Sequence, residues 1–213
     1  MVNMARVPTD GRSFESCGED PVVCYDMMYA EVEGIQSNNI LACTKHWVAN
    51  NGEFQRHEVT EIVSERAMHE LYYWAFRGGI NAGSGVVMCS YNRVSVQKEQ
   101  PFEMVTGLYA CENNITLPHL KTPEASGGLG FEGYVQSDWG ATHSTVQAAI
   151  NGLDQQMPDA SFFGSKLQQA VQSGDVPESR LDDMIVRILT PMYVYGLIDH
   201  PTTGNLSVDA TSP

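Results

Sequence analysis

An aspartate ends one of the apolar runs of this sequence and stands directly before an aromatic residue. The run begins at Gly133, the aspartate is Asp138, and Trp139 and Gly140 follow it. A carboxylate kept ionised by neighbouring donors can act as a nucleophile, and an aromatic ring offers an apolar platform to the C–H face of a sugar. An aspartate before a glycine turn is also a common turn or helix-capping residue, so this motif alone leaves both interpretations open.

Cationic and hydroxyl-bearing side chains follow other apolar runs. Lys45 and His46 end one run, Tyr91 ends another, Arg56 lies in the loop after the first, and Arg12 lies in an N-terminal turn. If they converge on the aspartate, they would keep it ionised and donate hydrogen bonds to the hydroxyls of a sugar. Each one also has an ordinary structural interpretation, as a solvated charge, a satisfied core histidine or an aromatic core residue.

Short apolar runs predict the strands that would position these residues, and amphipathic spacing predicts the helices between them. The predicted strands are Ile40–Thr44, Gly85–Tyr91, Gly133–Asp138 and Leu153–Met157. The predicted helices are Glu58–Phe76, with Thr60 as its cap and Gly78-Gly79 as its stop, Ser144–Asn151, ended by Gly152, Phe162–Ser173 and Ser179–Tyr195.

Alternation of apolar strands with helices indicates βαβ units and a parallel sheet. Polar residues at the carboxyl ends of the strands are typical of a (β/α)8 barrel, but an open doubly wound sheet gives similar local patterns. The chain has 213 residues, whereas such a barrel needs about 250, so the barrel interpretation implies missing parts. The sequence has no G-x-G-x-x-G or P-loop motif to favour a nucleotide site.

Composition excludes several classes of partner. The formal net charge of -14 argues against nucleic acid and favours a neutral or cationic substrate, and no apolar stretch approaches a membrane span. The five cysteines lack zinc-site spacing, so no metal is expected and most are predicted to be buried small hydrophobic residues.

The cellular compartment is left open by the sequence itself. The odd cysteine count fits reduced cytosolic thiols, whereas sequons at Asn114 and Asn205 fit a secreted glycoprotein. Met1 to Asp10 has no signal-peptide pattern, so a secretion signal would lie upstream.

A set of ordered motifs, spread from Asn3 to about Asp199, resembles glycoside hydrolase family three. They are Gly11-Arg12-x-Phe14-Glu15, Gly18-Glu19-Asp20-Pro21, Lys45-His46 with Asn50-Asn51 and Arg56, Glu65-Arg66, Val87-Met88-x-Ser90-Tyr91-Asn92, Gly130-Phe131-x-Gly133, Ser137-Asp138-Trp139, Gly152-Leu153-Asp154 and Met157-Pro158. The resemblance implies a retaining β-glucosidase in which Asp138 is the nucleophile, with no cofactor and no metal. It assigns first-subsite sugar contacts to the positions Arg12, Lys45, His46, Arg56, Met88 and Tyr91, with Trp139 beside the nucleophile.

The same resemblance implies that part of the enzyme is absent. Residues 1–199 would be a partial catalytic barrel, without the first strands and the following α/β sandwich domain, and residues 200–213 would begin an interdomain linker. The acid/base of the family usually comes from that second domain. We therefore expect an inactive isolated chain and a secreted or extracellular protein, with a cytoplasmic location as the alternative.

The stretch from Val94 to Gly130 departs from the family pattern. It is long, polar and irregular; Ser95 to Thr106 suggests an inserted loop or a translated intron, and Pro123 to Leu129 a second small insertion. A transcript that carries the codons for Ser95 to Thr106 would favour an inserted loop, and a transcript that lacks them would favour a translated intron.

Two other functions remain as alternatives to β-glucosidase. One is a non-catalytic carbohydrate-binding or scaffold protein that uses the same sugar contacts. The other is a related β-xylosidase or N-acetylhexosaminidase, although Lys45-His46-Trp47-Val48-Ala49 lacks the Pro-Gly that hexosaminidases of the family carry after Lys-His.

Overall fold

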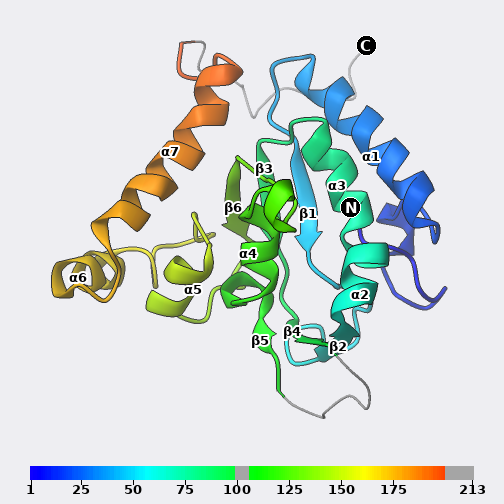
Figure 1. Ribbon diagram of the computed structural model, residues 1–213, viewed down its shortest axis with the longest axis horizontal. Helices are drawn as coiled ribbons and strands as arrows, with labels where there is room; N and C mark the ends of the chain where they lie inside the picture. The colour runs from blue at the N-terminus through cyan, green and yellow to red at the C-terminus, as the bar shows by residue number, and fades with distance from the viewer. Residues whose placement is uncertain (99–105, 200–213) are drawn as a thin grey trace, which may run out of the picture.

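The computed structural model describes residues 1–98 and 106–199 as an α/β protein (Figure 1). The strands are β1 (Cys43–Trp47), β2 (Thr60–Ser64), β3 (Val86–Cys89), β4 (Arg93–Gln97), β5 (Leu108–Tyr109) and β6 (Tyr134–Ser137). The α-helices are α1 (Pro21–Gln36), α2 (Glu65–Ala67), α3 (Trp74–Asn81), α4 (Thr116–Lys121), α5 (Val146–Asn151), α6 (Ser165–Ser173) and α7 (Glu178–Val194). A π-helical segment, η2 (Met68–Tyr72), joins α2 to α3, and the 3-10 turns are η1 (Ser13–Glu15), η3 (Ala110–Glu112) and η4 (Glu124–Ser126).

A parallel sheet of order β1-β3-β6 carries the core and confirms the predicted α/β class. Its register pairs Lys45 with Met88, and Met88 with Gln136. Val87 and Val135 are fully buried, which explains why these strands look like continuous apolar runs in the sequence. In Figure 1, α1 and α3 lie side by side next to β1, and α7 lies beyond β6. The strand predictions were correct for these three elements within one to three residues at each end.

A second three-stranded sheet lies beyond the carboxyl ends of the first (Figure 1) and corrects two predictions. β2 pairs with β4 in parallel, and β4 pairs with β5 in antiparallel orientation. The predicted helix from Glu58 therefore starts with a strand instead. Thr60 opens that strand, and the helix cap is Ser64, whose hydroxyl accepts a hydrogen bond from the Ala67 N–H. The five residues of β2 show no alternation of buried and exposed positions, so the helical spacing that continues after them dominated the prediction.

Two glycines predicted to stop a helix lie inside α3 and allow close packing. A Cβ on Gly78 would come within 2.3 Å of the Tyr25 carbonyl oxygen, and one on Gly79 within 2.8 Å of the Thr44 hydroxyl. The helix therefore continues to Asn81, because these positions serve contact with α1 and β1 rather than termination. Helix C-caps favour glycine, but so does close approach of two backbones.

The stretch that looked irregular is largely ordered. It contains β4, β5, η3 and α4, and Leu117 and Leu120 of α4 are fully buried. Pro123 to Leu129 includes the turn η4, while most of the suspected insertion Ser95 to Thr106 lies outside the described residues. Leu153 to Met157 forms a single parallel bridge, between Gln155 and Gln136, rather than a full strand.

The cysteines do not behave uniformly as buried small residues. Cys89, at the end of β3, forms a disulfide with Cys111 in η3, while Cys24 is buried, Cys17 half-buried and Cys43 exposed. Sequence alone gave no basis for the pairing, because the two partners lie on elements that only the fold brings together. Within the described ranges no helix is both long and apolar enough to cross a lipid bilayer.

Candidate active site

The carboxyl ends of β1, β3 and β6 bring all eight predicted site residues around one hollow. Its volume is about 310 Å³, and its lining is Arg12, Lys45, His46, Arg56, Met88, Tyr91, Asp138 and Trp139. Lys45 and His46 belong to β1, Met88 to β3, and Asp138 follows β6 directly. Because parallel strands end at the same edge of a sheet, residues distant in sequence meet there.

Backbone hydrogen bonds fix the strand ends that present these side chains. The Asp138 N–H donates to the Cys89 carbonyl (3.1 Å), and the Ser90 N–H donates to the Trp47 carbonyl (2.7 Å). At the other edge, the Asn3 side chain exchanges two hydrogen bonds with the His46 backbone, at 2.8 and 2.9 Å. The main chain is thus held on both sides of the aspartate and the histidine.

The carboxylate of Asp138 has one oxygen occupied by donors and one turned to a histidine. Oδ1 accepts hydrogen bonds from the Tyr91 hydroxyl (3.0 Å) and the Trp139 N–H (2.7 Å), while Oδ2 lies 3.4 Å from His46 Nε2. The side chain is 13% exposed, so solvent and small solutes can reach it. The two donors hold Oδ1 in place and so fix the orientation of the carboxylate at the base of the hollow.

The cations of the hollow contact other carboxylates rather than Asp138 directly. Arg12 donates twice to Glu15 at 2.9 Å, and Arg56 donates to Glu53 at 2.8 Å. Lys45 Nζ lies 3.9 Å from Glu15, a longer ion pair. The cations thus line the same hollow as Asp138, as the sequence predicted, while the direct partners of its carboxylate are a phenol, a backbone N–H and an imidazole.

His46 is a buried histidine at the base of the hollow. Burial lowers the pKa of His46 to about 3, against the opposing effect of the Asp138 charge. Nearby Arg12 and Lys45 act in the same direction as burial. At neutral pH the ring is therefore uncharged, and it can offer a hydrogen bond without adding a positive charge.

Tyr91 is held between ring neighbours. Arg56 lies over its ring with Cζ 4.5 Å from the centroid, and the His57 ring centroid lies 4.3 Å away. Burial and the adjacent Asp138 raise the pKa of Tyr91 to about 12. The phenol therefore stays protonated near neutral pH and remains a donor to the carboxylate.

Glu53 and His57 also contribute to the site, although the sequence did not predict them. Glu53 anchors Arg56 and also lies 3.7 Å from Arg12, and His57 packs on Tyr91. Both lie in the loop after β1, beside residues that were singled out, but an acidic or aromatic loop residue carries no distinguishing local pattern. Only the fold shows that this loop folds back over the strand ends.

A second hollow, of about 300 Å³, lies at the opposite ends of the strands. Gly85 and Gly133, which precede β3 and β6, contribute to its lining together with Phe131 and Pro191. Its lining is mostly apolar, and Glu132 and Tyr195 are its ionisable residues. The second hollow is therefore similar in volume to the first, but polar side chains do not converge on it in the same way.

Comparison with known proteins gives a consistent result. Residues 1–191 match the family model described as "Glycosyl hydrolase family 3 N terminal domain". The chain is 39% identical over 201 residues to "Probable beta-glucosidase L" of Aspergillus fumigatus, which covers 91% of this chain and 25% of that protein.

Solved structures agree with this match. A beta-D-glucoside glucohydrolase from Trichoderma reesei superposes with a TM-score of 0.79 and 38% identity, covering 90% of this chain and 26% of that one. DesR, a beta-glucosidase from Streptomyces venezuelae in complex with D-glucose, gives a TM-score of 0.80 at 32% identity, covering 100% and 26%. The chain thus spans about a quarter of the length of these relatives.

Proposed function

This chain belongs to the N-terminal domain of glycosyl hydrolase family 3, and on that premise we propose that it carries the nucleophile side of a retaining β-glucosidase site. The single observation that carries the proposal is the convergence of eight predicted residues on one hollow, with Asp138 reachable at its base. The names of the relatives, which describe beta-glucosidases, support the choice of a β-glucoside as substrate.

The two oxygens of Asp138 take different roles in this proposal. Oδ1 is held by Tyr91 and the Trp139 N–H, so Oδ2 is the oxygen that attacks the anomeric carbon. Attack displaces the leaving alkoxide and forms a covalent glycosyl-enzyme, which water then hydrolyses with overall retention. Arg12, Lys45, His46 and Arg56 donate to the sugar hydroxyls, and the half-exposed ring of Trp139 packs on the sugar face.

The general acid of the reaction comes from outside the described residues in this proposal. Glu15 and Glu53 pair with the two arginines that line the hollow, and the hydrogen bond from Arg12 lowers the pKa of Glu15. Glu15 is therefore ionised at neutral pH and has no proton to give to a leaving group. We therefore expect the 213 residues alone to have little or no activity on an unactivated glucoside.

The parallel sheet β1-β3-β6 forms part of a (β/α)8 barrel in this proposal. Each of these strands presents its chemistry at the carboxyl end, as barrel enzymes do. The remaining strands would come from parts of the protein outside the described residues. Residues 1–199 make up the partial barrel, and 200–213, outside the described residues, the linker.

A secreted location is also part of the proposal. The Cys89–Cys111 disulfide fits an oxidising compartment, and Asn114 of the first sequon is exposed to solvent. Asn205 of the second sequon lies outside the described residues.

Covalent labelling tests the nucleophile without requiring the general acid. 2-Deoxy-2-fluoro-β-glucosyl fluoride has a leaving group that departs without protonation, so the chain can form the glycosyl-enzyme even if its acid is elsewhere. We expect a mass gain of one fluoroglucosyl group, mapped by peptide mass spectrometry to Asp138. Asp138→Asn should abolish the gain, and Asp159→Asn, a change at an exposed carboxylate, should leave it intact.

The same reagent separates the alternatives. A label on another residue contradicts the assignment of Asp138, while glucose binding with no label at all favours a non-catalytic carbohydrate-binding protein. The corresponding fluoro-xylosyl and N-acetylglucosaminyl reagents compare substrate classes, and faster labelling by either would replace glucose as the expected sugar.

A further inference from the structure

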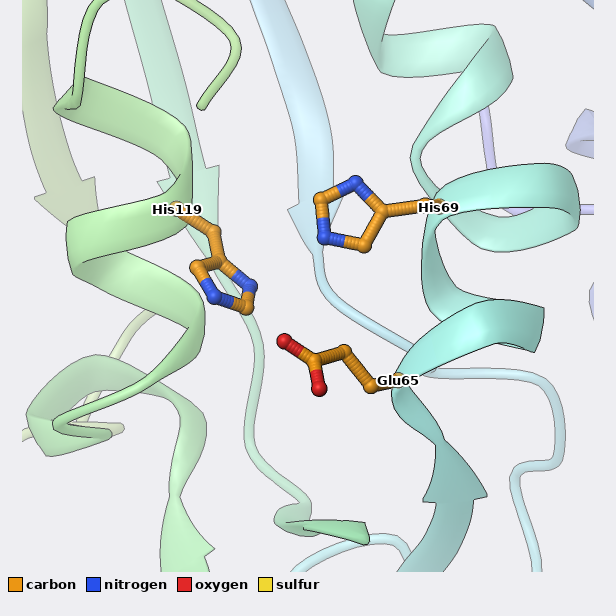
Figure 2. Close-up of side chains that lie close together, drawn as sticks. All are labelled: Glu65, His69 and His119. Atoms are coloured by element: carbon orange, nitrogen blue, oxygen red, sulfur yellow. The ribbon is translucent and has the colours of Figure 1, made fainter. Parts of the chain in front are cut away.

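Three potential metal ligands face one another on the side of the molecule that carries α2 and α4 (Figure 2). Glu65 and His69 are four residues apart on the α2–η2 segment, so they share one helical face. His119 reaches toward them from α4. One ligand atom from each residue lies within 4.8 Å of the others.

The side chains around this cluster leave room for an ion. Glu65 and His119 line a hollow of about 260 Å³ together with Lys98 and Pro118. All three potential ligands are half-buried, which allows an ion to enter from solvent and still be partly shielded from it. In the part of the chain that the structure describes, the Glu65 carboxylate forms no hydrogen bond or ion pair. His69 has ring contacts with Tyr73 and His119 but no hydrogen bond there, so both side chains retain lone pairs for an ion.

The ligand set selects a class of ion. Two imidazoles and one carboxylate are the ligands of zinc-class divalent ions, with metal–ligand distances of about 2.0–2.2 Å. Around such an ion, tetrahedral ligand atoms are about 3.4 Å apart, so the cluster has to contract by about 1 Å. Rotation of the flexible Glu65 side chain accommodates a change of that size.

A second contact orients one of the histidines. The Tyr73 hydroxyl lies 3.1 Å from His119 Nδ1, which leaves Nε2 available for an ion. A hydrogen bond on the second ring nitrogen is the usual support of a metal-bound histidine, since it fixes tautomer and ring orientation. Tyr73 itself is buried and stacks on Trp47, with ring centroids 4.7 Å apart.

We propose that Glu65, His69 and His119 bind one zinc-class divalent ion, which ties α4 to the α2–η2 segment. Three protein ligands leave the fourth coordination position to water, so the ion has an exchangeable ligand. The π-helical segment is consistent with this role, because such segments often occur at functional sites. Lys98 is the main competitor for Glu65, since it lines the same hollow, but no ion pair joins the two side chains in the part of the chain that the structure describes.

Zinc titration of the full chain tests the proposal. The protein is stripped with EDTA, dialysed, and titrated with ZnCl₂ against a chromophoric chelator; CoCl₂ then reports geometry through the intense visible band of four-coordinate cobalt. We expect one equivalent bound, with affinity weakened about 10-fold or more in His69→Gln and in His119→Gln. Tyr73→Phe, which removes no ligand, should weaken zinc about 10-fold through the orientation of His119.

Two controls make the outcome decisive. His143→Gln changes an exposed histidine that only stacks on Tyr109, and should bind zinc as the unchanged chain does. Cys17→Ser tests capture of zinc by the neighbouring thiols of Cys17 and Cys24 instead. Loss of binding in Cys17→Ser with retention in His69→Gln would overturn the proposal, as would the absence of one-equivalent binding.

A folding check covers the variant most at risk. His119→Gln loses a contact to a buried tyrosine and is therefore the variant more at risk of unfolding. His69 donates no hydrogen bond in the described ranges, so the result for His69→Gln decides the test if His119→Gln does not fold. Zinc should raise the thermal midpoint of the unchanged chain and of His143→Gln, because an ion that binds only the folded state stabilises it. An equal rise in His69→Gln contradicts the proposal.

Discussion

Asp138 and Asp154 are two carboxylates associated with β6 that differ in what surrounds them. Asp154 is fully buried and accepts hydrogen bonds from Lys121 (2.7 and 2.8 Å), Arg180 (2.7 Å) and the Val135 N–H (2.7 Å). Asp138 is 13% exposed, and its Oδ2 faces a neutral imidazole and an open hollow. The first carboxylate joins α4, β6 and α7, and the second is presented to solvent.

The difference teaches how to tell a structural carboxylate from a reactive one. Two cations and an N–H use up the lone pairs of Asp154, so no oxygen remains to attack a substrate. Asp138 leaves one oxygen without a strong donor beside the open hollow, where it is available for chemistry. In the sequence, both aspartates lie two residues from a glycine in short motifs, and only their partners in the fold distinguish them.

The largest expected effect is on reactivity at Asp138. Asp138→Asn should lower the rate of labelling by 2-deoxy-2-fluoro-β-glucosyl fluoride at least ~10⁴-fold, about 5.5 kcal/mol in activation free energy, because a neutral amide is a poor nucleophile. Timed mass spectrometry of the intact chain measures the rate. The urea midpoint of this variant should change little. Labelling at the original rate would contradict the conclusion that Asp138, unlike Asp154, is a reactive carboxylate.

The next largest effect is on stability at Asp154. Asp154→Asn leaves Lys121 buried without a counter-charge, removes one of the two carboxylates that pair with Arg180, and should lower the free energy of unfolding by about 3–5 kcal/mol. Urea denaturation followed by tryptophan fluorescence measures the change. Asp183→Asn is the matched control, since it also pairs with Arg180 but is 44% exposed, and should cost less than about 1 kcal/mol. Equal losses in the two variants would contradict the structural role of Asp154.

A smaller effect is expected from the phenol on Asp138. Tyr91→Phe removes the hydrogen bond to Oδ1 and should slow labelling about 10-fold, with little loss of stability, because a hydrogen bond to a charged group is worth roughly 1.5–3 kcal/mol at most. Tyr25→Phe, which loses only a remote contact with Asn81, serves as the control. Labelling at equal rates in both variants would show that Tyr91 does not position the carboxylate.

The smallest effect is the pH dependence caused by His46. Its folded-state pKa of about 3 lies below the ordinary value of 6.5, so unfolding takes up a proton between these pH values. This contribution to stability is fully present above pH 6.5 and is lost as pH falls toward 3. Urea midpoints measured at pH 7 and pH 5 should differ less in His46→Gln than in the unchanged chain, and an unchanged difference would count against a buried neutral imidazole.

The strands of the main sheet were predictable because burial on both faces makes them continuous apolar runs. Val86, Val87 and Val135 are buried, and each run ends where polar residues begin. β2 and β4 were not predictable, since they are mostly half-buried and pair with each other across more than thirty residues of sequence, and β5 is only two residues long. Helix α1 was also missed, although Asp20 caps it and Pro21 opens it, because its apolar residues show no sharp periodicity.

The candidate site was predictable in its membership but not in its contacts. The family motifs pointed to all eight residues that line the hollow. They did not indicate that Glu15 and Glu53 form ion pairs with the arginines. Nor did they indicate that Tyr91 and a backbone N–H donate hydrogen bonds to Asp138. Side-chain partners depend on the path of the loop after β1, and no local pattern in the sequence determines that path.

The glycines of α3 have a consequence for how the protein tolerates change. Gly79 lies against Thr44, the residue before Lys45 and His46, so an added methyl group there would press on the strand that presents them. Gly79→Ala would therefore displace groups of the hollow without touching any of them. Substitutions that impair this protein's function need not lie in its candidate active site. A survey of natural variation should therefore treat position 79 as functionally sensitive.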